Sequence, residues 1–267
     1  MSKISNFYYL LATVKNWPLA LSTYLGLVKE DYATLRLRNG LQIKIRTKTS
    51  DLHEVIAVLS GRDYPARLIL PYLRKEAVIV NIGAHIGTFD LFINGLCEYC
   101  YLYDFEPERS NYDLLKVNLR LNNISNVNLN NMAVLDQDGW LKFAGEEKFK
   151  NEFHSDADGG VRIKTTKLDT FIEENHIDGI DLLKMDCEGS EYDILPGFKG
   201  IFKCSAIMME YHLMNSGKAE LNVYQNDEFL IQLLLKCGFR LGYHLRNHHL
   251  KAGILFFENE NRKKPLK

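Results

Sequence analysis

The feature that most constrains this chain is an apolar run, residues 77–82, which ends at two glycines, Gly83 and Gly87. Continuous apolar runs of this length are typical of parallel strands that are buried on both faces of a sheet. A helical pattern follows over residues 88–97. Because a parallel strand needs a crossover connection, usually a helix, the segment predicts one strand-turn-helix unit of an α/β protein.

The alternation of strand and helix recurs along the rest of the chain. Further strands are expected at residues 101–105, 126–134, 180–185 and 206–211, and helices at residues 108–121, 168–174, 191–195 and 228–236. A hairpin, residues 140–143 and 161–166, interrupts the pattern. The last two strands, residues 239–245 and 253–258, leave no room for a helix, so we expect antiparallel pairing at one sheet edge. The pattern predicts a doubly wound α/β fold with a mostly parallel sheet.

The N-terminal part of the chain lacks this alternation. Residues 4–28 have a helical pattern that breaks near Pro18, two alternating runs flank the turn dipeptide Asn39-Gly40, and a helix is expected over Asp51–Leu59. The apolar N-terminal stretch is too interrupted for a membrane-spanning helix, which needs about 20 apolar residues in a row. We expect an amphipathic helix packed on the protein, with peripheral contact to a membrane surface as the alternative. The expected division is an extension over residues 1–70 and a main domain over residues 71–267.

Charge and cysteine content exclude several classes of protein. The 267 residues include 33 basic and 34 acidic side chains, so the chain lacks the basic face of a general nucleic-acid binder. Five cysteines, an odd number in a chain long enough for a good core, indicate a reducing compartment, and we expect a cytoplasmic location. Cys97 and Cys100 have no second pair at zinc spacing, so we expect a buried structural pair.

Candidate binding residues follow the first two strands of the main domain. In an open parallel sheet, ligands bind beyond the carboxyl ends of the strands, where the strand order reverses. Gly83 and Gly87 allow a tight turn and a close backbone approach, and the helix behind them offers free N–H groups. Glu106 ends the next strand, where an acid can accept both hydroxyls of a ribose. The glycines do not follow G-x-G-x-x-G, so a nucleoside site is predicted rather than a dinucleotide site.

Acidic residues and a histidine follow two later strands. Asp186 and Glu188 lie between a strand and the next helix, where acids also serve as helix caps. Glu210 and His212 share one face of the following strand and could equally be a structural pair. An acid that ends a strand at the reversal point is better explained by function. Asp186, Glu188, Glu210 and His212 are therefore the candidate catalytic residues.

Taken together, these motifs resemble the FkbM family of methyltransferases. The resemblance is carried by residues 78–87, by Asp104-Phe105-Glu106-Pro107, by Asn131-Met132-Ala133-Val134 and, most specifically, by the Asp-x-Glu-Gly-x-Glu stretch that begins at Asp186. The segments come in the family's order. The resemblance implies the seven-stranded class I methyltransferase sheet and S-adenosylmethionine as cofactor. It also implies methyl transfer to a hydroxyl, often on a sugar or a secondary metabolite, so a small-molecule or glycan acceptor is expected.

The resemblance implies a cofactor site formed by Asn81, Gly83, Ala84, His85, Gly87, Glu106 and Ala133, with Ala133 leaving room for the adenine ring. The family usually has Asp where this chain has Asn81, and Asn where it has His85. Asn81 lacks the charge that would face the cofactor's amino-acid portion, which leaves open a second hypothesis, a non-catalytic cofactor-binding or interaction domain. If the rest of the site is intact, Asn81→Asp is expected to tighten cofactor binding. A nicotinamide dehydrogenase, the third hypothesis, is disfavoured by the glycine spacing.

For catalysis, we expect Asp186 to orient the acceptor hydroxyl and His212 to remove its proton, since an ordinary His pKa of about 6.5 suits proton transfer near neutral pH. Glu210 is expected to orient His212. A divalent metal held by Asp186 and Glu210 is an alternative that the sequence leaves open. Residues 144–160 and the N-terminal extension are expected to shape the acceptor pocket. The sequence identifies neither the acceptor nor the oligomeric state.

Overall fold

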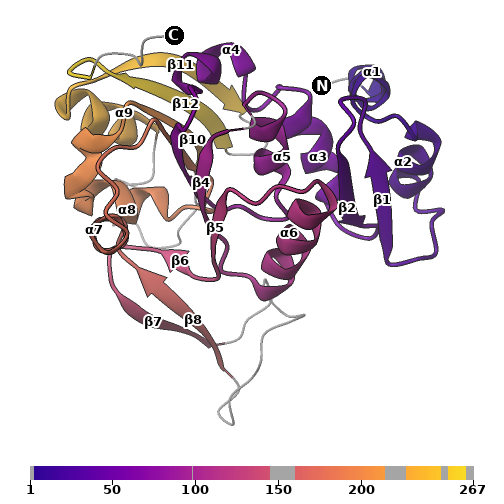
Figure 1. Ribbon diagram of the computed structural model, residues 1–267, viewed down its shortest axis with the longest axis horizontal. Helices are drawn as coiled ribbons and strands as arrows, with labels where there is room; N and C mark the ends of the chain where they lie inside the picture. Colours follow the sequence, from indigo (N-terminus) through magenta and orange to yellow (C-terminus); the bar gives the residue numbers. More distant parts are fainter. Residues whose placement is uncertain (1–2, 98, 145–159, 214–226, 248–251, 263–267) are drawn as a thin grey trace.

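The computed structural model describes residues 3–97, 99–144, 160–213, 227–247 and 252–262. A seven-stranded sheet with the order β11-β12-β10-β9-β3-β4-β5 forms its centre (Figure 1). These strands are β3 (Val78–Ile82), β4 (Tyr101–Phe105), β5 (Val127–Asn130), β9 (Leu182–Met185), β10 (Ala206–His212), β11 (Phe239–Asn247) and β12 (Ala252–Asn259). Neighbours from β5 to β10 are parallel, and β12 is antiparallel to both of its neighbours. The predicted α/β fold is confirmed, and the strand order reverses between β3 and β9.

Different helices cover the two faces of the sheet (Figure 1). One face carries Val80 and Ile82 and packs against α7 (Leu168–Glu174), α8 (Glu191–Gly197) and α9 (Asp227–Lys236). The other face carries Ile79 and packs against α3 (Asp51–Leu59) and α5 (Thr88–Asn94). Because side chains alternate along a strand, Asn81 points to the same face as Ile79, toward α5. Shorter helical segments are α4 (Ala66–Ile69) and the 3-10 turns at Leu70–Tyr72 and Lys199–Lys203.

The N-terminal residues form the helices and the hairpin that the sequence predicts. The elements are α1 (Lys3–Thr13), α2 (Trp17–Tyr24), β1 (Tyr32–Arg36) and β2 (Gln42–Arg46). They lie on the α3 and α6 side of the molecule, beyond the helices that cover the sheet (Figure 1). No helix in the described ranges has both the length and the apolar character needed to span a membrane.

The hairpin is held on α6 (Arg109–Leu121) by two asparagine side chains. Asn118 accepts from the N–H of Lys44 at 2.7 Å and donates to its carbonyl at 3.0 Å. The Asn122 side chain, directly after the helix, does the same with Gln42, at 2.7 Å in both directions. The backbone groups at this edge of β2 are thereby hydrogen-bonded to side chains of α6 and its C-terminal end instead of to another strand. The extension, α6 and the loop after β3 also share one hydrophobic cluster, which includes Leu35, Ile43, Val55, Ile86 and Leu115.

One expected strand, residues 126–134, is divided in two by the fold. β5 ends at Asn130, and Ala133 belongs to β6 (Ala133–Val134), which pairs with the hairpin of β7 (Gly139–Ala144) and β8 (Gly160–Thr166). Asn131, between β5 and β6, causes this division. Its Nδ2 donates to the carbonyls of Glu106 and Pro107, at 2.8 and 3.1 Å. These hydrogen bonds turn the chain away from the sheet. The segment expected to shape the acceptor pocket falls mostly within residues 145–159, outside the described residues.

Candidate active site at the strand ends

The loop after β3 is a tight turn that contacts β9. Gly83 has a φ of +79°, and a Cβ there would overlap the carbonyl oxygen of Asp186. Only glycine allows this approach of the two strand ends. Gly87 has a φ of +87°, and a Cβ there would lie 2.7 Å from Leu115 of α6. The predicted close backbone approach is therefore present, but at Gly83 its partner is the neighbouring strand.

Glu106, at the end of β4, is held by backbone donors. One carboxylate oxygen accepts from the N–H of His85 and the other from the N–H of Glu108, both at 2.8 Å. Asn111 of α6 adds a donor at 3.4 Å, and the side chain is 5% exposed. Burial raises the pKa of Glu106, while the backbone donors and the charge of His85 oppose the rise. An ionised carboxylate offers about four lone-pair positions, so Glu106 can still accept from a ligand hydroxyl.

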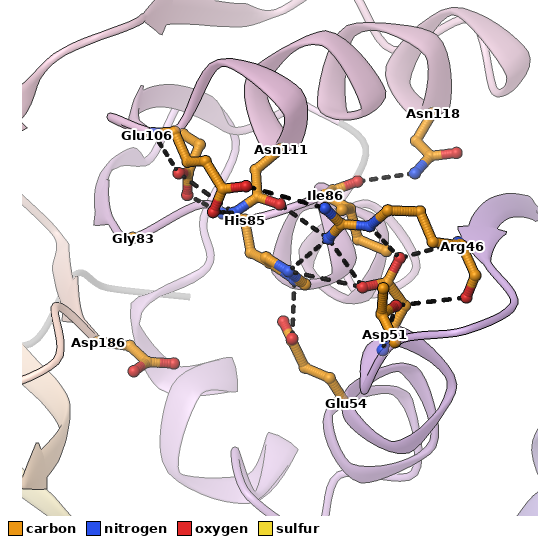
Figure 2. A network of polar contacts seen from close by, with 12 residues as sticks. Arg46, Asp51, Glu54, Gly83, His85, Ile86, Glu106, Asn111, Asn118 and Asp186 are labelled. Atoms are coloured by element: carbon orange, nitrogen blue, oxygen red, sulfur yellow. Dashed lines mark hydrogen bonds and ion pairs between the residues drawn. The ribbon is translucent and has the colours of Figure 1, made fainter. Parts of the chain in front are cut away.

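His85 connects this loop to the N-terminal extension (Figure 2). Its Nδ1 lies 2.7 Å from Glu54 Oε2, and its Nε2 lies 3.7 Å from Asp51 Oδ1. Burial alone would lower the pKa of His85, but Glu54, Asp51 and Glu106 raise it above the ordinary value. The His85 side chain thus lies among carboxylates from α3 and the end of β4, and its backbone has a φ of +50°.

Arg46, the last residue of β2, forms the centre of the same network (Figure 2). Its Nε and Nη2 donate to the two carboxylate oxygens of Asp51 at 3.0 and 2.9 Å, and Nη2 also donates to Asn111 at 2.8 Å. Nη2 lies 3.2 Å from His85 Nε2. Asp51 is 1% exposed, so this is a mostly buried ion pair with bidentate geometry. The hairpin, α3, α6 and the loop after β3 are therefore joined through one guanidinium group.

On the other side of the loop, two buried side chains bracket Asp186. Lys184 Nζ donates to the carbonyl of Gly83 at 2.7 Å and lies 3.9 Å from Asp186 Oδ2. The hydroxyl of Tyr64, in the segment between α3 and α4, donates to Asp186 Oδ2 at 3.3 Å. Tyr64 packs edge-on against Phe89 of α5. The hydrogen bond from Tyr64 and the charge of Lys184 hold Asp186 where the strand order reverses.

Glu210 lies near Asp186 but has a different environment. It has no side-chain hydrogen bond to any residue that the structure describes, in contrast to Glu106. Burial raises the pKa of Glu210 to about 8; the charge of Asp186 adds to the rise and the charge of His212 opposes it. A carboxyl with this pKa is mostly protonated at pH 7 and becomes a base slightly above it.

His212 is paired with Glu191 instead of Glu210, contrary to the prediction. Its Nδ1 lies 3.4 Å from Glu191 Oε1, and Glu188 Oε2 lies 3.8 Å from its Nε2. Glu191, in the first turn of α8, folds back over the strand end and accepts from the N–H of Cys187. Burial would lower the pKa of His212, but Glu191 and Asp186 raise it to about 9. A histidine that is protonated at neutral pH does not fit the expected role of base.

The other predicted residues occupy varied positions. Asn81 is fully buried, and its amide lies 3.2 Å from Asp104 Oδ1 and 3.5 Å from Asp90 Oδ2. Ala84 is buried in the hydrophobic cluster of the extension. Ala133 is partly exposed in β6, and the Glu188 side chain is 88% exposed. Within the described residues, no group of three or more His, Cys, Asp or Glu side chains is arranged to hold a metal ion.

The sequence reasoning missed the residues that hold this site from outside the motifs, namely Arg46, Asp51, Glu54, Tyr64, Asp90 and Lys184. One of them carried a readable signal, because Lys184 is a charged residue in an otherwise apolar strand, Leu182-Leu183-Lys184-Met185. Arg46 and Asp51 lie in the extension, and their contacts to the loop span dozens of residues. No local pattern marks such contacts.

Comparison with known proteins matches this chain to one family. A family model described as the methyltransferase FkbM domain matches residues 81–241. The 2-O-methyltransferase NoeI of Sinorhizobium fredii is 26% identical over 196 residues, which cover 66% of this chain and 80% of that protein. The methyltransferase sdnD of Sordaria araneosa is 29% identical over 159 residues, which cover 47% of this chain and 61% of that protein.

Solved structures of low identity also align with part of this chain. An rRNA methylase from Streptococcus thermophilus aligns with a TM-score of 0.44 and 11% identity, over 72% of this chain and 92% of that one. TYW2 from M. jannaschii, solved in complex with AdoMet, aligns with a TM-score of 0.44 and 15% identity, over 87% and 88% of the two chains. The family match rests on sequence and spans more than half of the 267 residues. The chain therefore belongs to the FkbM family of S-adenosylmethionine-dependent methyltransferases.

Proposed function

We propose that this chain is an O-methyltransferase that acts on a hydroxyl of a small molecule or glycan. The observation that carries the proposal is Glu210, a carboxyl with a pKa of about 8 beside Asp186 at the reversal point. A hydroxyl that is methylated must lose its proton, and the most effective general base has a pKa near the working pH. The similarity to NoeI, a 2-O-methyltransferase, supports a hydroxyl as acceptor.

The residues around the loop fit the cofactor of the family. Gly83 provides a turn that a Cβ would block, and Glu106 is a fixed acid with free lone pairs for ribose hydroxyls. We assign the turn between Gly83 and Gly87 to the amino-acid portion and Ala133 to the side of the adenine. When bound, S-adenosylmethionine supplies a methyl group on a positively charged sulfur.

The chain's own side chains then have distinct tasks. Asp186, held by Tyr64 and Lys184, orients the acceptor hydroxyl. Glu210, once ionised, accepts the hydroxyl proton as the oxygen is methylated, and the charge of His212 stabilises its ionised form. This assigns the base to Glu210 in place of His212, because His212 is held as an imidazolium by Glu191.

The test is transfer of a radiolabelled methyl group from S-adenosylmethionine to a panel of sugars, glycans, phenols and amines. We expect transfer to a hydroxyl, with kcat rising with pH up to about 8 and a large loss in Glu210→Gln. Glu174→Gln, which changes an exposed glutamate on α7, is the matched control and should behave like the wild type. Transfer to amines alone would contradict the proposal, and cofactor binding without any transfer would favour the non-catalytic alternative. Loss of transfer in EDTA with recovery in magnesium would replace the Glu210 base by a metal.

A further inference from the structure

A row of polar side chains crosses three buried strands directly beneath the binding loop. Lys184 of β9, Asn81 of β3 and Asp104 of β4 are Cα partners in the parallel ladder, so they point to the same face of the sheet. Asp90, in the first turn of α5, covers the row from that face. All four residues are at most 2% exposed. Burying charged side chains away from water costs free energy unless their charges balance one another.

The contacts in the row indicate how the charges balance. Asn81 Nδ2 lies 3.2 Å from Asp104 Oδ1 and 3.5 Å from Asp90 Oδ2, so the amide bridges the two carboxyls. The other oxygens, Asp90 Oδ1 and Asp104 Oδ2, are buried and have no donor among the described residues. The two carboxyls interact through a side-chain hydrogen bond, and two carboxyls can form one only if one of them keeps its proton. Burial raises the pKa of both groups, and Lys184 opposes the rise. The carboxyl pair then holds one negative charge against one positive charge on Lys184.

We propose that the Asp90–Asp104 pair supplies the single negative charge beneath the cofactor loop, and that Asn81 is adapted to this pair. The inference rests on the proposed binding of S-adenosylmethionine, whose amino-acid portion carries an ammonium and a sulfonium. This negative charge does not lie on Asn81 itself. It is carried by the neighbouring strand and helix, and the amide of Asn81 connects it to the residue that leads into Gly83.

This arrangement reverses the expected effect of Asn81→Asp. A third carboxyl between Asp90 and Asp104 would add a negative charge that Lys184 cannot balance. Single changes of either aspartate have a different consequence. In Asp90→Asn or Asp104→Asn, the remaining carboxyl ionises and the new amide takes the place of the shared proton. The charge beneath the loop is therefore lost only when both aspartates are changed.

The experiment measures the affinities of two ligands by calorimetry, together with thermal unfolding without ligand. S-adenosylmethionine carries the cationic amino-acid portion, and 5′-methylthioadenosine lacks it. For Asp90→Asn combined with Asp104→Asn, we expect an approximately tenfold or greater loss of S-adenosylmethionine affinity and little change for 5′-methylthioadenosine. Adding Asn81→Asp to that double variant places one carboxylate between two amides and should recover most of the loss. Asn81→Asp alone should not tighten binding.

Several outcomes separate this inference from others. Equal losses for both ligands, with no recovery in the triple variant, would show a purely structural role and overturn it. Tighter binding in Asn81→Asp alone would also overturn it, because the charge beneath the loop would then be missing in the wild type. If the double variant does not fold, Asn81→Asp and the triple variant still decide, since the triple variant has the charge of the wild type. Failure of the wild type to bind either ligand would instead contradict the proposed function.

Discussion

Two glutamates at the strand ends, Glu106 and Glu210, carry the same functional group but differ in their hydrogen-bond partners and neighbouring charges. Glu106 directly follows β4 and Glu210 lies near the end of β10 in the same sheet, and burial raises the pKa of both. Glu106 receives two backbone N–H donors at 2.8 Å, and the loop that supplies one of them is fixed by His85, Arg46 and the extension. The Glu210 side chain has no hydrogen bond within the described residues, and the neighbouring charge that raises its pKa most is another acid, Asp186.

From this difference we infer different roles for the two ends of the site, the cofactor end around Glu106 and the acceptor end around Glu210. A carboxylate held by backbone donors is already oriented, so a ligand hydroxyl can bind to it without ordering further side chains. A buried carboxyl beside a second acid changes its protonation easily, which suits proton transfer and not tight binding. We therefore expect changes near Glu106 to affect cofactor affinity, and changes near Glu210 to affect the reaction and its pH dependence.

The largest effect is expected at Gly83, where the loop after β3 contacts the end of β9. Gly83→Ala would place a Cβ against the carbonyl oxygen of Asp186 at a φ of +79°, so the loop or the end of β9 must move. We expect cofactor affinity to fall by more than about 100-fold, or ~2.7 kcal/mol, in a calorimetric titration. The matched control is Gly26→Ala, which has a φ of +68° and open space around the new methyl. Similar losses of affinity in both variants would show that the contact with Asp186 is not the cause.

The next largest effect tests whether the N-terminal extension stabilises the cofactor end of the site, around Glu106. Arg46→Gln would leave the buried carboxylate of Asp51 without its bidentate partner and remove the donor to Asn111. We expect the free energy of unfolding to fall by about 2–3 kcal/mol in a denaturant titration, with weaker cofactor binding. Lys48→Gln, which removes an exposed ion pair with Asp31 next to the same hairpin, should resemble the wild type. Unchanged cofactor affinity in Arg46→Gln would separate the extension from the site.

A smaller effect concerns the pH dependence of stability at the acceptor end. Glu210 and His212 have pKa values of about 8 and about 9 in the folded protein, against about 4.3 and 6.5 in an unfolded chain. Both groups bind a proton more tightly when folded, so their contribution to stability is lost as the pH rises through these ranges. Between pH 6.5 and 8, the free energy of unfolding should fall by about 2 kcal/mol per pH unit.

Glu210→Gln should remove roughly half of that slope, because one of the two protons no longer titrates. Asp113→Asn is the control, since nearby Lys116 and Arg109 hold the pKa of Asp113 below its ordinary value and it stays ionised throughout. A slope that is the same in wild type and Glu210→Gln would mean that Glu210 is already ionised near neutral pH. That result would remove the reason for assigning it the role of base.

Much of the fold was predictable because its signals are local. Continuous apolar runs identified the parallel strands, and the short spacing of the last two strands gave their antiparallel pairing. Gly83 and Glu106 were identifiable for the same reason, since each directly follows a strand. The third strand was predicted too long because its end depends on Asn131, whose side chain bonds backbone groups 24 and 25 positions earlier in the chain.

The environments of the site residues could not be predicted in the same way. The hydrogen bond between Tyr64 and Asp186 joins residues 122 positions apart, and the pairing of His212 with Glu191 depends on how α8 packs over β10. The pKa of a buried group is set by such neighbours and not by its own motif. The sequence therefore identified the candidate residues at the reversal point, whereas the choice between Glu210 and His212 as base required their contacts.

The most direct test of the division between the two ends is a calorimetric titration of S-adenosylhomocysteine into Glu106→Ala and Glu210→Gln, compared with the wild type. S-adenosylhomocysteine cannot transfer a methyl group, so the measurement reports cofactor binding alone. We expect Glu106→Ala to lose ~1–3 kcal/mol of affinity, about five- to 150-fold, through the lost charged hydrogen bond. Glu210→Gln should bind within about twofold of the wild type, a difference of ~0.4 kcal/mol. Equal losses in both variants, or a loss in Glu210→Gln alone, would contradict the account.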